Sequence, residues 1–528
     1  MSLYNYSGRV DKSIIQRALE AYRQYRADKE PLIERIRDNE RFYRRSCTAL
    51  SSEADKNMTC DTPFIFAAIE NARADAADNF PRADILEREP GGTGAAELLS
   101  RIVPAQLEIS DFKRAFKDNI RIKLKYGTAV YGVFYNERSG NIDIKSVDIL
   151  DIYADMHIPD IQESPFLFIS AAVENETLRK EYPDFAELFD GDAEVESLFE
   201  SYRLCGRTAV LDCYYKKPDG SVHMMKLCKD TVIAATEDMD GYETGLYSHG
   251  MYPVVFDVLY PDEHCPFGFG MIDIGKLTQI EINKLDAALT ENVMCASKPR
   301  FLAKRSGGID EEEFKDLSKN IVHYEGDSDA VKPISTAQVG EFALAHREYK
   351  KEELKEVLGN RDFQQGSTTG GVTAASAIET LRQTGEKRSR AIINDTYDSY
   401  KKIIYMMLEL MRQFFDQVHV YRINDDFGQK SFAGFSNAMM YTSIWNGEGA
   451  ELKKLMFDIE VVPMRESPIS RESVNNTIMS FWNGGMFTPD ARQSAIIALK
   501  NMSFDGKEQL IADLQTMREE ETDNGEGT

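Results

Sequence analysis

The histidines and cysteines are the side chains of this sequence that could act as nucleophiles or metal ligands. The seven cysteines are scattered and never form a C-x-x-C pair, and the seven histidines never stand at ligand spacing. His264 and Cys265 are adjacent and precede Gly268, so they could pair as a nucleophile and its base. No third group that would orient such a pair is identifiable, and a buried structural cysteine is the more common meaning of this pattern.

Motifs of the common nucleotide-dependent and hydrolytic enzymes are absent. No G-x-x-x-x-G-K-[ST] phosphate loop, H-E-x-x-H zinc motif or G-x-S-x-G elbow occurs, and the run from Gly268 to Gly270 lacks the rest of a dinucleotide fingerprint. Carboxylates are so numerous that pairs on one helix face, such as Glu352 and Glu356, are expected to be solvated. The sequence therefore predicts no catalytic residue, no metal site and no cofactor.

The composition is that of a large, acidic, globular protein. A chain of 528 residues can bury a sizeable core and would ordinarily form two to four domains. The net charge of −25 opposes tight wrapping of DNA, although a duplex that must slide should not be held firmly. Dispersed cysteines fit a reducing compartment, and neither a signal peptide nor a run of ~18 apolar residues is present. We expect a protein that is cytosolic when made.

The hydrophobic periodicity predicts an α+β protein. Helical spacing occurs at residues 11–45 (with an interruption near Pro31), 63–79, 95–125 (with a break near Pro104), 177–182 and 271–296. Period-two alternation predicts strands at 129–135, 142–147, 166–173, 210–215, 222–227, 254–259, 300–303, 320–324, 331–334, 418–423 and 457–462. Residues 266–270 are expected to form a turn that launches the helix beginning at Met271.

A polar glycine loop between two long helices is the most informative stretch. The loop, residues 359–371, reads GNRDFQQGSTTGG and runs into a helix start in which Ser376 and Glu379 have capping-box spacing. A helix from Val372 to Phe414 would span roughly 65 Å at about 1.5 Å per residue. A polar loop on such a long helix, in a chain without catalytic motifs, suggests a mechanical element that lines a passage.

An ordered series of motifs resembles the portal (head-to-tail connector) proteins of tailed bacteriophages. The resemblance covers residues 11–515, and no single motif is diagnostic by itself. The series is PLIERIRDNERFY (31–43), IENARAD (69–75), KYGTAVY (125–131), YPVV (252–255), FGFGMIDIG (267–275), VTAASAI (372–378) and PISRES (468–473).

The resemblance implies a ring-forming portal fold with wing, stem, clip and crown regions. On this sequence the regions would be the wing (1–265, with strands at 416–465), stem helix 1 (266–297), the clip (298–335), stem helix 2 (336–359), the tunnel loop (360–371), the long wing and tunnel helix (372–415), the crown (466–517) and a disordered acidic tail (518–528).

The resemblance would turn the tunnel loop toward the channel. Its candidate DNA-contacting residues are Arg361, Gln364, Gln365, Ser367, Thr368 and Thr369. Neutral hydrogen-bonding groups can contact phosphates without strong ionic contacts that would stop a moving duplex. The alternative interpretation of this composition is an ordinary solvated surface loop. A possible basic belt beside the loop comprises Arg382, Lys387, Arg388 and Arg390. Ordinary surface pairing with acids such as Glu386 is an equally expected role for these bases.

The proposed clip and stem also carry patterned residues. The clip is bipolar, which fits a docking surface for a motor and an adaptor, with bases followed by acids at Lys304, Arg305, Asp310, Glu311 and Glu312. The first stem helix has apolar residues at near-helical spacing, expected to share one face, at Ile274, Leu277, Ile282, Leu285 and Leu289. Either the chain's own core or a neighbouring subunit could cover that face.

These features predict a phage portal protein, a ring at one capsid vertex that is the channel for genome packaging and ejection and performs no chemistry. The expected partners are further copies of the chain, commonly about twelve in a closed ring, duplex DNA, the terminase large subunit, a head-completion or tail adaptor protein, and the major capsid and scaffold proteins, with no membrane. The expected location is the virion, and the host cytoplasm during assembly. The alternatives are a nucleic-acid-processing enzyme with an unrecognised carboxylate metal site and a monomeric scaffold protein.

Overall fold

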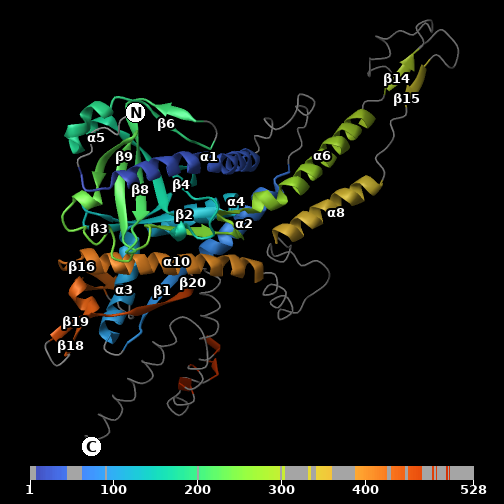
Figure 1. The fold of residues 1–528 in the computed structure, drawn as a ribbon. Coiled ribbons are helices and arrows are strands. Elements are labelled where there is room, and N and C mark those ends of the chain that lie inside the picture. The colour runs from blue at the N-terminus through green and yellow to red at the C-terminus, as the bar shows by residue number, and fades with distance from the viewer. Residues whose placement is uncertain are drawn as a thin grey trace, which may run out of the picture. The chain divides into compact units, whose positions relative to one another are not determined.

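The computed structural model describes most of the chain. The described residues are 8–44, 62–89, 92–198, 201–297, 300–303, 331–334, 341–359, 387–424, 430–445 and 450–465, with 479–480, 483–484, 495–496 and 499. Helices and strands are mixed along the chain, so the predicted α+β class is confirmed (Figure 1). The chain divides into two compact units: unit 1 holds residues 1–37, 70–270 and 387–528, and unit 2 holds residues 38–69 and 271–386.

A five-stranded antiparallel sheet is the largest sheet of unit 1. Its strand order is β10-β9-β8-β5-β4, formed by β4 (Ile152–Ala154), β5 (Phe166–Glu174), β8 (Arg207–Lys216), β9 (Val222–Cys228) and β10 (Thr231–Ala235). Helix α1 (Lys12–Tyr43) covers one face, where Tyr22 meets the rings of Tyr153 and Phe168 edge-on at 5.3 Å each. The alternation of side chains along each strand therefore gives this sheet one face dedicated to α1.

The other face of that sheet packs against a second, three-stranded sheet. This sheet has the order β11-β2-β3, formed by β2 (Thr128–Asn136), β3 (Asn141–Val147) and β11 (Val254–Val258). Leu167 and Tyr214 of the larger sheet are buried with Val130 of the smaller one in a shared cluster. The predicted hairpins at 129–147 and 210–227 and the predicted strand at 254–259 are confirmed.

Helices and short sheets surround these two layers. Further helices in the described part of unit 1 are α3 (Thr93–Ile109), α4 (Phe112–Tyr126), α5 (Asn175–Glu181) and α10 (Lys387–Phe414), and α2 (Phe64–Asp78) is divided between the units. The two-stranded sheets pair β1 (Asn79–Glu87) with β20 (Phe457–Arg465), β6 (Ala193–Val195) with β7 (Tyr202–Leu204), β12 (Tyr260–Asp262) with β13 (Cys265–Phe269), β16 (His419–Asn424) with β17 (Lys430–Phe435) and β18 (Tyr441–Trp445) with β19 (Ala450–Lys454).

Three local predictions in unit 1 are wrong because packing overrides the local signals. Helix α1 continues through Pro31, and the buried side chains of Leu32, Ile33 and Ile36 outweigh the one backbone hydrogen bond that proline removes. Pro104 lies inside α3, and the break falls instead at Asp111, whose φ of 51° is left-handed.

The third wrong prediction is the turn at residues 266–270, of which residues 266–269 lie in strand β13. Gly268 accounts for the misreading, because a Cβ at this position would lie 2.2 Å from the carbonyl oxygen of Tyr260. This glycine therefore permits a close approach of two backbones and does not make a turn.

A fully buried ion pair anchors α10 in unit 1. Lys123 of α4 donates from Nζ to Asp257 Oδ1 at 2.7 Å and to Thr396 Oγ1 at 2.8 Å, and both charged side chains are completely inaccessible to solvent. Ser399, one turn further along α10, donates to the same Asp257 oxygen at 3.2 Å. The pair therefore joins α4, β11 and α10 at one point.

We predict that Lys123→Met destabilises unit 1 by about 3–5 kcal/mol, because it leaves the Asp257 charge buried without its partner. The double variant Lys123→Met with Asp257→Leu should cost less than the single one, since no unpaired charge remains. Guanidinium denaturation measures both, with the exposed Lys117→Met on the same helix as the matched control, expected within about 0.5 kcal/mol of the parent. A Lys123→Met chain as stable as its control contradicts the anchoring role.

Stability should also depend on pH through His249. Burial lowers the pKa of this imidazole from 6.5 to about 4, and Nδ1 accepts a hydrogen bond from the backbone nitrogen of Met251 at 3.0 Å. The unfolded chain takes up the proton at higher pH than the folded chain does, so stability is full above about pH 6.5 and falls as the pH drops toward 4. Denaturation midpoints across this range measure the slope, and His249→Asn should make it shallower; an equal slope in both proteins contradicts the assignment.

Candidate functional site: the helix pair of unit 2

Most residues predicted to contact DNA or docking partners lie outside the described part of the chain. These are the loop residues Arg361, Gln364, Gln365, Ser367, Thr368 and Thr369, the belt residue Arg382, and the clip residues Lys304, Arg305, Asp310, Glu311 and Glu312. The first turn of α10 includes three further belt residues, Lys387, Arg388 and Arg390, but the structure does not describe their side chains. Their roles stay predictions.

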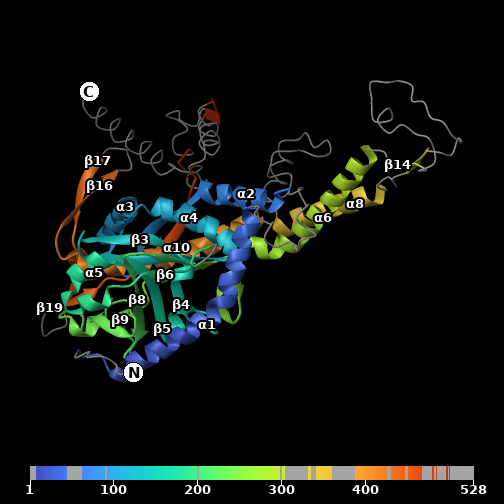
Figure 2. The same cartoon turned by 90° about the horizontal axis from the view of Figure 1, so that it is seen from above.

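Unit 2 instead offers two helices, one on each side of the predicted clip in sequence, and the predicted loop follows the second helix. Helices α6 (Met271–Ser297) and α8 (Glu341–Leu358) pack side by side (Figures 1 and 2). Strands β14 (Arg300–Ala303) and β15 (Val331–Ile334) pair antiparallel, with Arg300 opposite Ile334. The predicted helix at 271–296 and these two predicted strands are confirmed. The described part of the predicted second stem helix ends at Leu358, as expected.

The helices approach closely at Gly275, near the start of α6. A Cβ at this position would lie 3.1–3.2 Å from methyl carbons of Ile65, Leu354 and Leu358. Side chains of α2 and α8 thus close over the bare backbone of α6. Glycine is weak in a helix interior, and here the close packing explains its presence.

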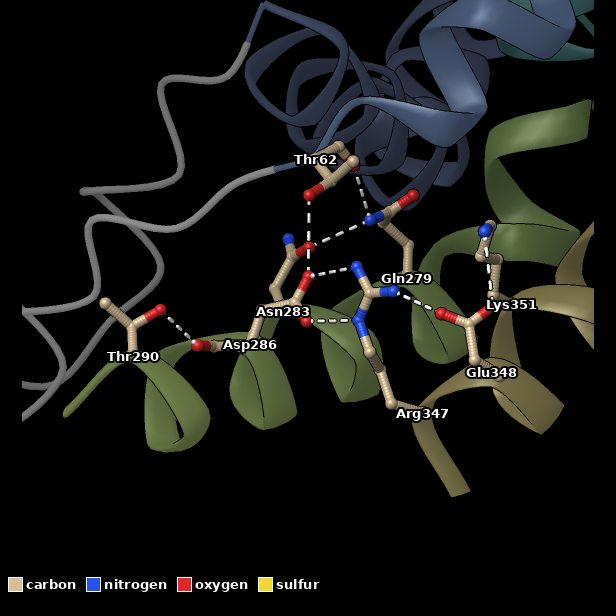
Figure 3. A network of polar contacts seen from close by, with 8 residues as sticks. All are labelled: Thr62, Gln279, Asn283, Asp286, Thr290, Arg347, Glu348 and Lys351. Carbon is tan, nitrogen blue, oxygen red and sulfur yellow. Dashed lines mark hydrogen bonds and ion pairs between the residues drawn. The ribbon is translucent and has the colours of Figure 1, made fainter. Parts of the chain in front are cut away.

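Further along the pair, a two-pronged ion pair sets the register of α6 against α8 (Figure 3). Arg347 donates from Nε to Asp286 Oδ1 at 2.6 Å and from Nη2 to Asp286 Oδ2 at 3.2 Å. The hydrogen bond to Asp286 is the main cause of the raised pKa of Arg347. A planar guanidinium matches a carboxylate in only a few orientations, so this contact fixes rotation and translation of one helix along the other.

The N-terminal residues of unit 2 join the same network. Gln279 is almost fully buried and donates from Nε2 to the Thr62 carbonyl and to Asn283 Oδ1, both at 2.8 Å (Figure 3). Thr62 in turn donates from its hydroxyl to Asp286 Oδ2 at 3.4 Å. Asn39 donates to Asp273 at 2.8 Å near the first turn of α6. Residues 38–69 therefore belong structurally with the helix pair, although they lie more than two hundred positions earlier in the chain.

The outward faces of the pair are partly apolar. Leu277 is 75% exposed while Ile282 is fully buried, so the chain's own core covers only part of the predicted apolar face of α6. Five residues turn a helix through about 500°, which places these two side chains about 140° apart. Exposed large side chains on the two helices are Leu277, Val293, Met294, Phe342, Leu344 and Tyr349. Large apolar side chains left exposed on both helices make the pair a candidate interaction surface.

Charged side chains on the same two helices form ion pairs between the helices and within α8. Lys350 pairs with Glu281 of α6 at 3.1 Å, and Lys351 pairs with Glu348 on its own helix at 3.2 Å. The hydrogen bond from Lys351 is the main cause of the lowered pKa of Glu348. Such exposed pairs contribute little individually, so Arg347 and Asp286 carry most of the polar specificity.

The chemistry of a catalytic site is not assembled among the described residues. Burial raises the pKa of the Cys265 thiol, and His264 is exposed, so the adjacent pair lacks the thiolate that a nucleophile needs. No cluster of three or more His, Cys, Asp or Glu side chains that could hold a metal ion occurs in the part of the chain that the structure describes. The helices described there also include none that is long and apolar enough to cross a membrane.

Sequence reasoning missed the residues that organise the pair, namely Arg347, Asp286, Gln279 and Thr62. The signal was weak, because Asp286 sits between Leu285 and Leu289 in an apolar stripe and Arg347 is one of many charges on α8. A polar residue interrupting an apolar helix face often has a buried partner, but the sequence does not say which partner it is.

A comparison with protein-family models finds one family that covers this helix pair. The model described as "Phage P22-like portal protein" matches residues 219–527, which is more than half of the chain and includes α6, β14, β15, α8 and α10. A search of curated proteins finds no significant match.

We predict that Arg347→Ala loosens α8 against α6 and costs about 2 kcal/mol, because two charge-assisted hydrogen bonds to Asp286 are lost. Arg347→Lys should recover only part of this, since an ammonium group cannot make the two-pronged contact. Hydrogen exchange of the α6 and α8 amides measures the effect locally. The matched control is Lys351→Ala on the same helix, which removes an exposed pair; equal exchange in Arg347→Ala and the control contradicts the prediction.

Proposed function

This chain belongs to the family of phage P22-like portal proteins, and from that membership we propose that it assembles into a closed ring at one vertex of the capsid. The ring serves as the channel through which the genome is packaged and later ejected. The single observation that carries this proposal is the family match, because it spans the helix pair and the segments flanking it. Portal proteins of this family are structural, which agrees with the absence of the common enzyme motifs from the sequence.

The helix pair supplies the physical support for a ring. Phe342 is 82% exposed, and Leu277 and Tyr349 are also solvent-exposed. In a ring, one surface of each subunit meets a different surface of the next, so apolar residues on both helices become covered. Burying a large apolar side chain stabilises an interface by about 1.5–3 kcal/mol. The pair therefore acts as the stem in our proposal.

The contacts that fix the register of α6 against α8 suit a helix pair that must form the same interface in every subunit. Arg347 and Asp286 hold α6 and α8 in one relative position, and Gln279 ties them to the residues around Thr62. A helix pair that could slide would present a different set of apolar residues to each neighbour. A fixed register instead gives every subunit of a closed ring the same contact surface.

We propose that the tunnel loop, residues 360–371, contacts the DNA that passes through the channel. Its candidate residues are Arg361, Gln364, Gln365, Ser367, Thr368 and Thr369, with Arg382, Lys387, Arg388 and Arg390 as a basic belt beside it. The net charge of −25 supports passage, because an acidic protein offers duplex DNA few ionic contacts that would hold it in place.

The proposed clip is the docking end for partners. The bipolar segment with Lys304, Arg305, Asp310, Glu311 and Glu312 lies in sequence between β14 and β15, whose pairing brings its two ends together. Opposite charges kept in separate blocks favour recognition of a complementary surface. The proposed partners there are the terminase large subunit during packaging and a head-completion or tail adaptor protein afterwards. Major capsid and scaffold proteins would surround the ring at the vertex.

The test is the native mass of the purified protein, measured by native mass spectrometry and light scattering. A closed ring of about twelve chains is the expected species. Replacing Phe342 and Tyr349 together by serine should shift the population toward free subunits, because both contacts lose apolar area. The matched control replaces Met239 and Met439, which are each 44% exposed on unit 1, by serine and should leave the ring intact. A protein that stays monomeric at all concentrations, with or without capsid proteins, contradicts the ring.

A further inference from the structure

Helix α4 carries a basic strip on an otherwise acidic chain. Its apolar residues face the core, with Phe112, Phe116 and Ile120 buried. The opposite side presents four bases at helical spacing, namely Lys113, Arg114, Lys117 and Arg121, with Asp118 as the acid among them. The sum of charge on this face is therefore positive, whereas the whole chain has a net charge of −25.

Arg114 and Arg121 of the basic strip make only long contacts with acids of the chain. Arg114 is 80% exposed and reaches Asp118 at 4.0 Å, the outer limit for an ion pair. Arg121 lies 3.5 Å from Glu70, whose carboxylate already pairs with Arg73 at 2.7 Å. Exposed pairs of this kind exchange partners readily, so Arg114 and Arg121 can also pair with an acidic surface of another chain.

A second patch of unit 1 has the opposite charge, and we call residues 174–194 the acidic lobe. It comprises α5, a 3-10 turn at Pro183–Leu188 and β6. The lobe contains eight carboxylates against the bases Arg179 and Lys180. Leu178 and Phe189 are buried against residues of the five-stranded sheet, so the lobe is firmly attached to unit 1. All eight of its acids are exposed, and three of them, Glu174, Glu181 and Asp190, form ion pairs with bases of unit 1. The other five are Glu176, Asp184, Glu187, Asp192 and Glu194.

We propose that in the assembled ring the acidic lobe of one subunit docks on the basic strip of the next. This inference rests on the ring proposed above and adds a second, electrostatic contact in unit 1. The two patches occupy separate places on that unit (Figures 1 and 2). A contact between unlike surfaces is what a closed ring requires, because each subunit must offer one patch to either neighbour. Complementary charge would also fix which surfaces meet.

A second copy of the chain is a better occupant for the basic strip than DNA. Four bases on a single helix, in a chain with a large negative charge, would hold a duplex weakly. DNA would also leave the acidic lobe without a role, whereas a neighbouring subunit accounts for both patches at once. The contact should weaken with salt, because exposed charges are screened over about 8–10 Å at physiological ionic strength.

Charge reversal in the full-length chain tests this contact. Arg114→Glu with Lys117→Glu reverses the basic strip, and Glu187→Lys with Glu194→Lys reverses the acidic lobe. Each double variant should raise the concentration at which half of the chains are in rings by at least about tenfold. Joining all four substitutions in one chain should restore assembly, because every interface then pairs opposite charges again. The matched control, Lys12→Glu with Arg23→Glu on α1, makes the same change in net charge as the basic-strip variant and should assemble like the parent.

The outcomes separate this inference from the ring itself. A parent chain that never forms rings defeats the proposed function, whereas a parent ring with fully assembled reversal variants defeats only the contact described here. Failure of the four-fold variant to restore assembly, or equal loss in the control, also overturns the contact. Thermal melting of each variant detects unfolding, and the restored four-fold variant still decides the case. Rings that assemble normally but lose affinity for a fluorescent DNA duplex on basic-strip reversal would assign the strip to DNA and overturn the proposal.

Discussion

The ion pair between Lys123 and Asp257 is the constraint on which the organisation of unit 1 depends. Two charges that are completely removed from water are tolerated only because each finds its partner and additional hydroxyl groups. Those hydroxyls come from Thr396 and Ser399 of α10, a helix more than 250 residues away from Lys123 in sequence. Any displacement of α10 would strand a charge in the core, so the helix has one allowed position against α4 and β11.

In unit 2 an ion pair also fixes the position of one helix against another, but this pair is less buried than the one in unit 1. Arg347 and Asp286 remain partly accessible, and their contribution is directional more than energetic, because a guanidinium and a carboxylate align in few ways. The helix pair can then leave large apolar residues on its outside without losing its own register. Surfaces that are exposed in one chain and internally rigid suit repeated contact between identical subunits, and charge-bearing patches on unit 1 would add selectivity to such contacts.

Several elements were predictable because their signals are local. The strands at 300–303 and 331–334 and the helix beginning at Met271 follow from residue type and period alone. The predictions at Pro31, Pro104 and Gly268 were wrong for a common reason. Each is a residue whose local preference is real but costs only a few kcal/mol at most, and burial of neighbouring side chains or close backbone packing outweighs it. Strand β1 was missed because Pro81 interrupts it, and proline within a run argues against a strand.

By itself, the sequence determined the α+β class, the acidic character, the lack of common catalytic motifs and a resemblance to portal proteins that the family match supports. These properties depend on composition, short-range period and motif order, all of which are written along the chain. Only the tertiary structure decided that Lys123 meets Asp257 and Thr396, that Arg347 grips Asp286, and that residues 38–69 belong with the helix pair. Such contacts depend on which distant segments are folded together, and a single charged or polar residue in the sequence carries no record of its partner.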